Sequence, residues 1–390
     1  MTTGPDATRP RLVTGSFAVI TLAALAYFTA IGMSLPTLPR MVEDDLSGGG
    51  LAVGVTAGAL AVTAALLRPW VGRTGDRSGR QVLVVGGGTV AAVALLGHGL
   101  AADVPQLVLA RLVMGGGEAM FFVGAATAVQ DLAPDARRGE AASYFSVAIW
   151  GGTGIGPFLA EVLRDAHGTD AVWWTAAALC AIGALLGLAV PPGGSGQAPT
   201  STRLVHPAAL APGVVLLLAV TGLGAFQTFV ALHVDDLGMH DAAGVFLLYS
   251  AVVLVVRVAG ARAADVFGGR RVAGAGIALG AVGLALIALA TTPAGLYAGT
   301  AVMALGLAPV YPALFSLVIG ATPDNERTAA VATFTLFFDL SQGLGLPLLG
   351  LVAALGGERA AFGAGAVVEV AGVLLLRAVL RDPGRAVPAG

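Results

Sequence analysis

The ten residues GRTGDRSGRQ (72–81) decide the fold, because they crowd charge into one short stretch of a very apolar chain. The charged side chains are Arg73, Asp76, Arg77 and Arg80. Only 11% of the 390 residues are charged, and apolar runs of membrane-spanning length flank the stretch at 51–70 and 82–102. About 20 apolar residues in a helix cross the hydrocarbon core of a bilayer. The stretch therefore predicts a turn at the membrane surface between two spanning helices.

The whole chain has the composition of a membrane protein. It is 56% hydrophobic, with a mean hydropathy of +0.86, whereas soluble proteins are about 45–50% apolar and about 25% charged. Apolar runs predict an all-α membrane protein of twelve transmembrane helices, at roughly 14–37, 51–70, 82–102, 106–130, 140–163, 171–190, 211–234, 243–260, 272–291, 295–320, 328–354 and 359–380. The 57 glycines favour close packing between these helices.

Several function classes are disfavoured by what the sequence lacks. Lysine is absent, which excludes a G-x-x-x-x-G-K-[ST] phosphate loop. The single Cys180 cannot form an internal disulfide or a thiolate metal cluster, and no G-x-S-x-G or H-E-x-x-H motif occurs. The net charge of −2 gives no support for nucleic-acid binding. We therefore expect neither an enzyme nor a cofactor nor a metal site.

The arginines predict the orientation. With both termini in the cytoplasm, 17 of the 21 arginines fall on the cytoplasmic side, while Arg40, Arg164 and Arg359 fall outside and Arg111 lies within a helix. Positively charged residues concentrate in cytoplasmic loops. The sequence therefore predicts a multi-pass protein of the cell's inner (plasma) membrane, with residues 72–81 at the cytoplasmic surface.

The chain repeats itself at an offset of 189 residues. Matched pairs include Arg68 with Arg257, Asp76 with Asp265, Pro134 with Pro323 and Arg138 with Arg327. Six helices per half make the repeat parallel. Between the halves, PPGGSGQAPTST (191–202) has the composition of a flexible linker. We expect a six-helix bundle at 1–190, a cytoplasmic linker at 191–210 and a second bundle at 211–390.

This architecture resembles the major facilitator superfamily. Gly72-x-x-x-Asp76-Arg77-x-Gly79-Arg80 is similar to the family's helix 2–3 loop signature, and a degraded copy follows at 261–270. Arg111-x-x-x-Gly115-x-Gly117 and Gly152-x-x-x-Gly156-Pro157 are similar to the family's helix 4 and antiporter motifs, although Glu118, Ala160 and Glu161 depart from the usual pattern. The resemblance implies a latch between the bundles that forms when the cavity opens outward. The predicted gating residues are Gly72, Asp76, Arg77, Gly79, Arg80, Arg257, Asp265, Gly152, Gly156 and Pro157.

Ionisable residues inside the predicted helices are candidates for proton coupling. Charges at mid-bilayer are costly, so they are expected to face a cavity or a partner. Asp339 lies near the middle of the eleventh helix, and Glu118 near the middle of the fourth, where Arg111 is two turns away on the same face. We predict proton coupling through Asp339, Glu118 and Arg111. Glu369 is expected to be structural, and Glu161 and His233 to be solvated near the outer helix ends.

Polar and aromatic residues on the same helix faces predict a central substrate cavity. The predicted substrate-binding residues are Tyr27, Ser34, Phe122, Ser146, Trp150, Gln227, Tyr311, Thr335, Phe338 and Gln342. Further aromatic candidates are Tyr249, Phe334 and Phe337.

Two transport functions fit this sequence. The preferred one is a proton-coupled exporter of a small amphipathic or cationic compound, working as a monomer in the lipid bilayer. The alternative is a proton-symporting uptake permease for a sugar or an organic acid. A sugar site would be richer in Asn, Gln and Trp, and an organic anion would need arginine in the cavity, where the sequence places only Arg111.

Overall fold

Every regular element in the described part of the chain is a helix. The computed structural model describes residue 12 and residues 14–134, 137–192, 205–260, 263–322 and 327–379. Its first six helices are α1 (Gly15–Arg40, extended by the π-helical turn η1, Met41–Asp45), α2 (Gly50–Ser78), α3 (Arg80–Gly99), α4 (Val104–Leu132), α5 (Arg138–His167) and α6 (Thr169–Gly187). The others are α7 (Pro207–Asp236), α8 (Ala243–Ala259), α9 (Ala263–Phe267), α10 (Gly269–Leu289), α11 (Pro293–Leu307), α12 (Val310–Gly320) and α13 (Arg327–Val379).

The described helices cover all twelve predicted ranges, which confirms the predicted fold class. α13 joins the last two ranges, and it bends at Gly357, whose positive φ of 75° suits a residue without a side chain. α11 and α12 together cover the tenth range, with a break at Pro309, which has no N–H to donate. Ten helices of the described residues are long and apolar enough to cross a membrane, and α8 is a shorter apolar helix.

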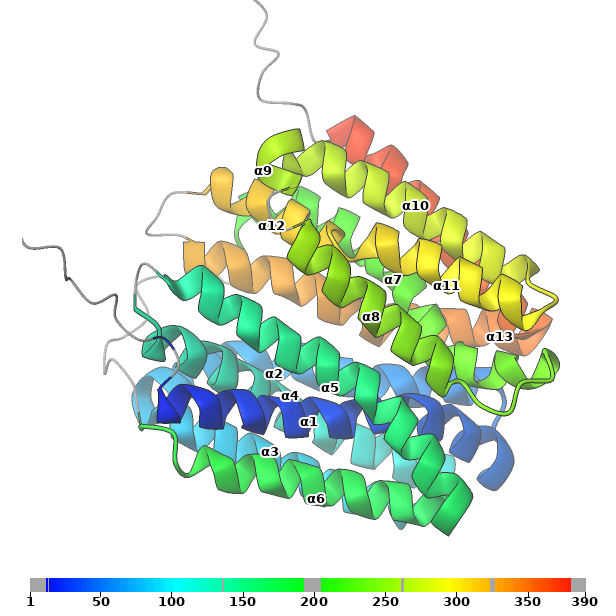
Figure 1. Cartoon of the computed structure of the whole chain (residues 1–390), viewed down its shortest axis with the longest axis horizontal. Helices are drawn as coiled ribbons and strands as arrows, with labels where there is room; N and C mark the ends of the chain where they lie inside the picture. The colour runs from blue at the N-terminus through cyan, green and yellow to red at the C-terminus, as the bar shows by residue number, and fades with distance from the viewer. Residues whose placement is uncertain are drawn as a thin grey trace, which may run out of the picture.

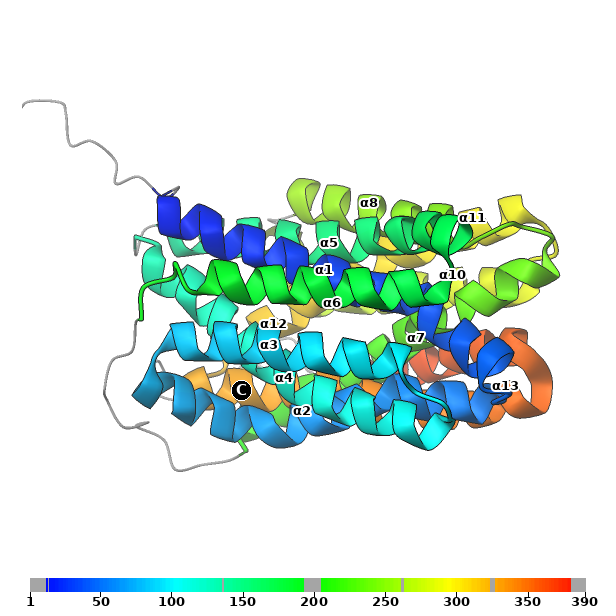
Figure 2. The ribbon, with the colours of Figure 1, turned by 90° about the horizontal axis from the view of Figure 1, so that it is seen from below.

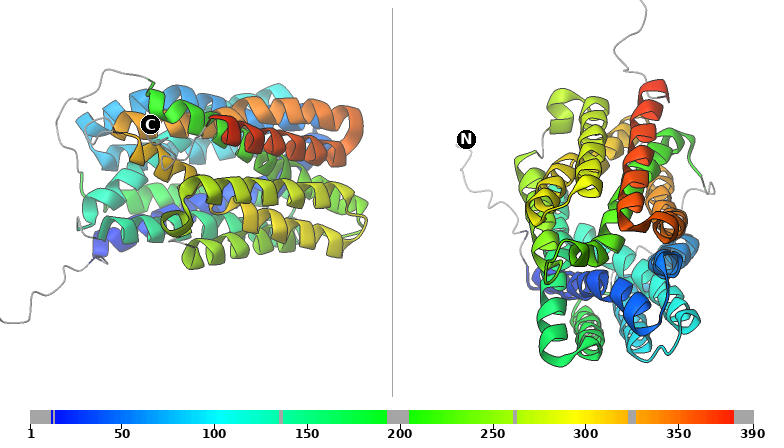
Figure 3. Two further views of the ribbon diagram at one scale, coloured as in Figure 1. Left: turned by 90° about the horizontal axis from the view of Figure 1, so that it is seen from above. Right: turned by 90° about the vertical axis from the view of Figure 1, so that its right-hand side faces the viewer.

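The two halves of the chain form two bundles that lie side by side. The helices up to α6 occupy the lower half of Figure 1, and α7 to α13 occupy the upper half. The right panel of Figure 3, an end-on view, shows the same division. Figure 2 shows the first bundle from the side that faces away from the second bundle. Across the boundary between the bundles, α2 packs on α13, α5 packs on α8 and α1 packs on α7. The boundary therefore runs between residues that are far apart in the sequence.

Residues 72–81 form less of a turn than expected. α2 continues through Ser78, so Gly72 is helical, and a Cβ at Gly72 would meet open space. The predicted turn therefore does not include Gly72. The chain turns at Gly79, which has a φ of 92° and separates α2 from α3. This turn requires the left-handed conformation that glycine adopts without strain.

Gly152 and Gly156 hold two helices of one bundle close together. A Cβ on Gly152 would lie 2.7 Å from the Thr29 nitrogen, and one on Gly156 would lie 2.6 Å from the Met33 nitrogen. Both of these contacts are with the backbone of α1. Small residues allow such close approach in membrane bundles. The gating role that the sequence predicts for Gly152, Gly156 and Pro157 stays a prediction.

The two bundles pack closely against each other at the end that holds Arg40. This end is called the outer end, because the predicted orientation places it outside the cell. A Cβ on Gly50 would lie 2.9 Å from the Ala354 nitrogen, and one on Gly54 would lie 2.9 Å from the Gly350 Cα. These are backbone contacts between α2 and α13. The outer end is thus closed by helix packing across the boundary.

Candidate functional site

One arginine joins the two predicted proton-coupling acids. Arg68 of α2 lies 3.5 Å from the Glu118 carboxylate of α4 and 2.8 Å from the Asp339 carboxylate of α13. The Asp339 contact is an ion pair whose atoms are not aligned for a hydrogen bond. All three side chains are at most 16% exposed. Because Glu118 belongs to the first bundle and Asp339 to the second, the Arg68 cluster (Arg68, Glu118 and Asp339) links the bundles by charge.

Sequence reasoning missed Arg68 as a site residue and placed it among the cytoplasmic arginines. Its guanidinium lies 5.3 Å from the centre of the Phe122 ring, so Phe122 lies at the Arg68 cluster, while its substrate-binding role stays a prediction. A cation over an aromatic face is attracted by the ring quadrupole. The signal that could have found Arg68 is its position inside α2, more than two turns before Ser78.

A second arginine lies in a cavity between the bundles. Arg257 of α8 has its guanidinium 5.1 Å from the centre of the Trp150 ring of α5. The Trp150 ring is itself 6.1 Å from that of Tyr249. Arg257 and Ser146 line the same cavity, which has a volume of about 400 Å³. Arg257, predicted as a gating residue, therefore lies with two predicted substrate-binding residues.

Tyr311 of the second bundle lies near both arginines, and other predicted substrate-binding residues of this bundle lie on α13. Tyr311 is close enough to Arg68, Asp339 and Arg257 to interact electrostatically with each, and Thr335 lies near its hydroxyl. Half-buried Phe338 packs against the apolar core. Gln342 donates a long hydrogen bond of 3.4 Å to the Val220 carbonyl of α7.

Three predicted substrate-binding residues have other surroundings. Tyr27 is fully buried and stacks on Phe121 at 3.9 Å, inside the first bundle. Ser34 is buried and donates its hydroxyl hydrogen to the Ile31 carbonyl of its own helix. Gln227 of α7 is half-buried, and its side chain forms no hydrogen bond with the described residues. Tyr27 and Ser34 are thus engaged in contacts within the first bundle, and their substrate-binding roles stay predictions.

Arg111 does not pair with Glu118. It donates to the backbone carbonyls of Thr56 at 3.0 Å and of Ala57 at 3.1 Å, both on α2. No ion pair between Arg111 and Glu118 occurs among the described residues, since Glu118 contacts Arg68. The geometry makes Arg111 a brace between α4 and α2, and its predicted part in proton coupling stays a prediction.

We expect Arg111→Gln to lower thermal stability while proton coupling per folded molecule is retained. The change removes two hydrogen bonds from a charged donor, each worth about 1.5–3 kcal/mol. Thermal unfolding of the purified protein and proton flux normalised to folded protein would measure the two effects. Unchanged stability with lost coupling would instead support the proton-coupling role.

Glu161 and His233 are buried, which corrects the prediction that they are solvated. Glu161 accepts a hydrogen bond of 2.8 Å from Arg40 of α1 and also pairs with Arg164. Arg40 reaches across the boundary to Asp235 of α7 at 3.6 Å. These ion pairs add charge contacts to the closed outer end.

Glu369 is fully buried in the second bundle. Its carboxylate fits between two glycines, because a Cβ on Gly222 of α7 would collide with it and one on Gly280 of α10 would lie 2.6 Å from it. Neither carboxylate oxygen has a hydrogen-bond partner among the described residues. The contacts of Glu369 lie between α7 and α10 of the second bundle, and its expected structural role stays a prediction.

The remaining predicted gating residues lie near the inner helix ends. Arg77 is exposed, and Arg80 contacts Asp131 of α4 at 3.2 Å. Arg80 also donates its backbone N–H to the Pro192 carbonyl. The side chains of Asp76 and Asp265 lie outside the described residues. The latch therefore stays a prediction.

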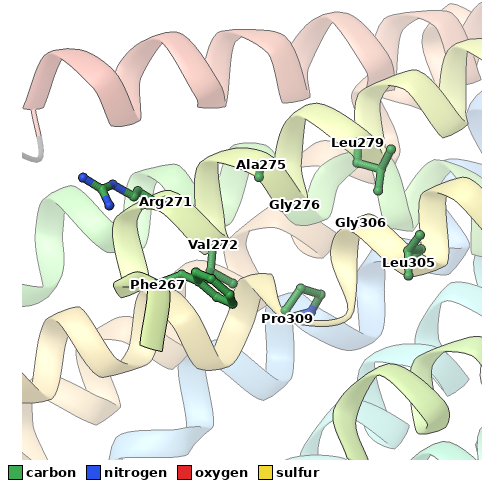
Figure 4. Close-up of a pocket in the computed structure, with 9 residues that line it drawn as sticks. All are labelled: Phe267, Arg271, Val272, Ala275, Gly276, Leu279, Leu305, Gly306 and Pro309. Atoms are coloured by element: carbon green, nitrogen blue, oxygen red, sulfur yellow. The ribbon is translucent and has the colours of Figure 1, made fainter. Parts of the chain in front are cut away.

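A separate groove lies within the second bundle, between α10 and α11. It has a volume of about 410 Å³, and except for Arg271 its lining residues are apolar or glycine. In Figure 4, Phe267, Val272 and Pro309 surround this groove, while the Arg271 guanidinium points away from it. The groove carries no polar group for binding a solute. No group of acidic, histidine or cysteine residues that could hold a metal occurs among the described residues.

Comparison with known proteins gives a consistent result over the whole length. The family model described as Major Facilitator Superfamily matches residues 20–261 and 213–389. The uncharacterised MFS-type transporter YhhS of Escherichia coli K12 is 27% identical over 378 residues, covering 95% of this chain and 93% of that protein. An uncharacterised MFS-type transporter of Burkholderia mallei SAVP1 is 28% identical over 371 residues, covering 92% and 90%.

Solved structures share the fold at low sequence identity. The nucleoside transporter NupG has a TM-score of 0.75 at 16% identity and covers 95% of this chain and all of its own. The human organic anion transporter MFSD10 has a TM-score of 0.71 at 18% identity and covers 93% of this chain and all of its own.

Proposed function

The chain belongs to the major facilitator superfamily of secondary transporters, and from that premise we propose that it exports a small amphipathic or cationic compound in exchange for protons. It does so in the inner (plasma) membrane, with both termini in the cytoplasm and as a monomer, since one chain supplies both bundles.

The Arg68 cluster carries this proposal. One guanidinium faces the two carboxylates of Glu118 and Asp339, so the ionised cluster has a net charge of −1. One further positive charge neutralises it, and either a proton or a cationic group of a solute can supply that charge. Two ligands that neutralise the same cluster compete for it, and such competition produces exchange.

Alternating access follows from the position of the cluster on the boundary. Asp339 lies on one bundle, and Arg68 and Glu118 lie on the other, so rocking of the bundles changes the Arg68–Asp339 distance. Protonation of Asp339 weakens its ion pair with Arg68. The two bundles are then held together less strongly at the Arg68 cluster and separate there more easily. The proton is in this way coupled to the state of the cavity.

A second function, proton-coupled uptake of an organic acid, is favoured by one specific observation. Arg68 and Arg257 both lie at the boundary between the bundles, whereas the sequence suggested only Arg111 there. An organic anion needs such cations. Protonation of Asp339 would free Arg68 for the anion, and proton and solute would then bind together.

The experiment that separates these functions measures protons in inverted membrane vesicles with an acidic interior. Lipophilic cations, amphipathic acids, sugars and small organic acids are added while a pH probe is followed. Export predicts proton release when a cationic or amphipathic compound is added, and membranes without the protein give no signal. A response only to sugars or small organic acids, in the direction of cotransport, would replace export by uptake.

A further inference from the structure

Arg257 is a half-buried cation that lacks, among the described residues, the carboxylates of its repeat partner. Its Nε is buried and has no hydrogen-bond partner, and no described carboxylate pairs with Arg257. Buried donors are almost always satisfied by some acceptor. Arg257 also lines the 400 Å³ cavity together with Ser146, so a ligand in that cavity can reach it.

The internal repeat shows which group is missing. Under the offset of 189 residues, Arg257 corresponds to Arg68, and Trp150 corresponds to Asp339. Each arginine crosses the boundary to the corresponding position of the opposite bundle, where Arg68 meets a carboxylate and Arg257 meets an indole ring. The other acid at Arg68, Glu118, corresponds to Leu307. The positions that correspond to both acids, Trp150 in the first half and Leu307 in the second, are thus occupied by apolar residues.

We propose that the cavity at Arg257 binds an anionic group of the transported compound, which takes the place of the missing carboxylate. A guanidinium binds a carboxylate or sulfonate through two parallel hydrogen bonds. Trp150 supplies an apolar face beside it, and the Ser146 hydroxyl lies on the same cavity wall. The transported compound is therefore an amphipathic molecule with an acid group on its aromatic or aliphatic body, in addition to the cationic group that competes with the proton at the Arg68 cluster.

This inference rests on the proposed function and narrows its substrate. It gives Arg257 a binding role in place of the gating role that the sequence suggested. The anion site and the Arg68 cluster use different side chains. A variant can therefore lose the preference for an anionic ligand without losing proton coupling, or lose proton coupling without losing that preference.

The test compares two probes of similar shape, 2-naphthoate and neutral 2-naphthylmethanol. Their affinities for the purified full-length protein follow from the rise in melting temperature with ligand concentration. We expect the wild type to bind the acid at least about tenfold more tightly than the alcohol, which corresponds to about 1.4 kcal/mol. Equal affinities in the wild type, or no stabilisation by either probe up to its solubility limit, would overturn the proposal.

Variants assign the preference to Arg257. Arg257→Gln is expected to bind the acid and the alcohol equally, and Arg257→Lys to keep part of the preference. Trp150→Asp supplies the missing carboxylate from within and should also abolish the preference, although Arg257 is still present. Retention of the full preference in Arg257→Gln or Trp150→Asp would contradict the assignment.

Two further variants serve as controls. Arg271→Gln removes an exposed arginine outside this cavity and should keep the preference, so its loss there would indicate a nonspecific charge effect. Asp339→Asn should keep the preference for the acid while losing proton release. If Asp339→Asn keeps both, the proposed coupling fails while the anion site stands.

Discussion

Arg68→Gln is expected to destabilise the folded protein and to abolish transport. The change leaves Glu118 and Asp339 without the arginine that contacts both of them. Removing one partner of a buried ion pair costs about 3–5 kcal/mol. Thermal unfolding of the purified variant and solute-driven proton flux in vesicles would measure the two losses. Arg73→Gln, which removes an exposed arginine from the same helix, is the matched control. It should keep both the stability and the transport of the wild type.

A double-mutant cycle tests whether this loss comes from the ion pair itself. Asp339→Asn alone should be stable enough to fold, because Arg68 still faces Glu118. The double variant Arg68→Gln/Asp339→Asn should be more stable than Arg68→Gln, since one unpaired acid has gone, and it should still lack proton coupling. Neighbouring residues in such a network couple by about 0.5–3 kcal/mol. Additive losses would show that Arg68 stabilises the fold through other contacts.

Most of the fold could be predicted because it depends on properties that are local in sequence. Apolar runs predicted where the helices lie, and the helix bounds differ from the predicted ranges by a few residues, except that α2 continues eight residues beyond its range. The largest surprise at a turn, the helical state of Gly72, arose because a charged stretch at a helix end is as stable in the final helical turns as in a loop. Hydropathy cannot distinguish these two cases.

The site was predicted less completely because it depends on contacts between the bundles. Sequence placed Glu118 and Asp339 in the cavity from their positions inside helices, but it paired Glu118 with Arg111 on the same helix face. Two turns of helix separate that pair by about 10 Å along the axis. Arg111 instead meets the backbone of α2, and Arg68 reaches Glu118 from that same helix. Only the packing of α2 on α4 and α13 reveals this arrangement.

The repeat contained more information than the motif resemblance. The offset that aligns Arg68 with Arg257 also aligns their partners across the boundary, Asp339 and Trp150. The sequence therefore listed all four residues, but in separate roles. Their common geometry shows two matched arginines, one held by acids of the protein and one without an acid. This asymmetry leaves one arginine held in the proton-binding cluster and one available for an anionic group of the solute.

Gly54→Leu is expected to open the outer end and to reduce transport strongly. A Cβ at Gly54 would collide with the Leu346 carbonyl oxygen and lie 2.9 Å from the Gly350 Cα, both backbone atoms of α13. Backbone atoms cannot swing aside as a flexible side chain can, so α2 and α13 must separate. Overpacking of this kind costs about 1–3 kcal/mol. A shift of that size changes the ratio of two states by about 5–150-fold.

The opening can be measured as a distance between spin labels on the two helices. Leu51 of α2 and Leu355 of α13 are both exposed near this contact, and Cys180, the only native cysteine, can be replaced by alanine. In Gly54→Leu the label distance should increase relative to the parent, and solute-driven proton flux should fall. Gly363→Leu is the matched control, because a Cβ at Gly363 of α13 meets nothing within 4 Å. An unchanged distance in folded Gly54→Leu would mean that the outer contact tolerates a side chain, and that closure depends instead on the ion pairs of Arg40 with Glu161 and Asp235.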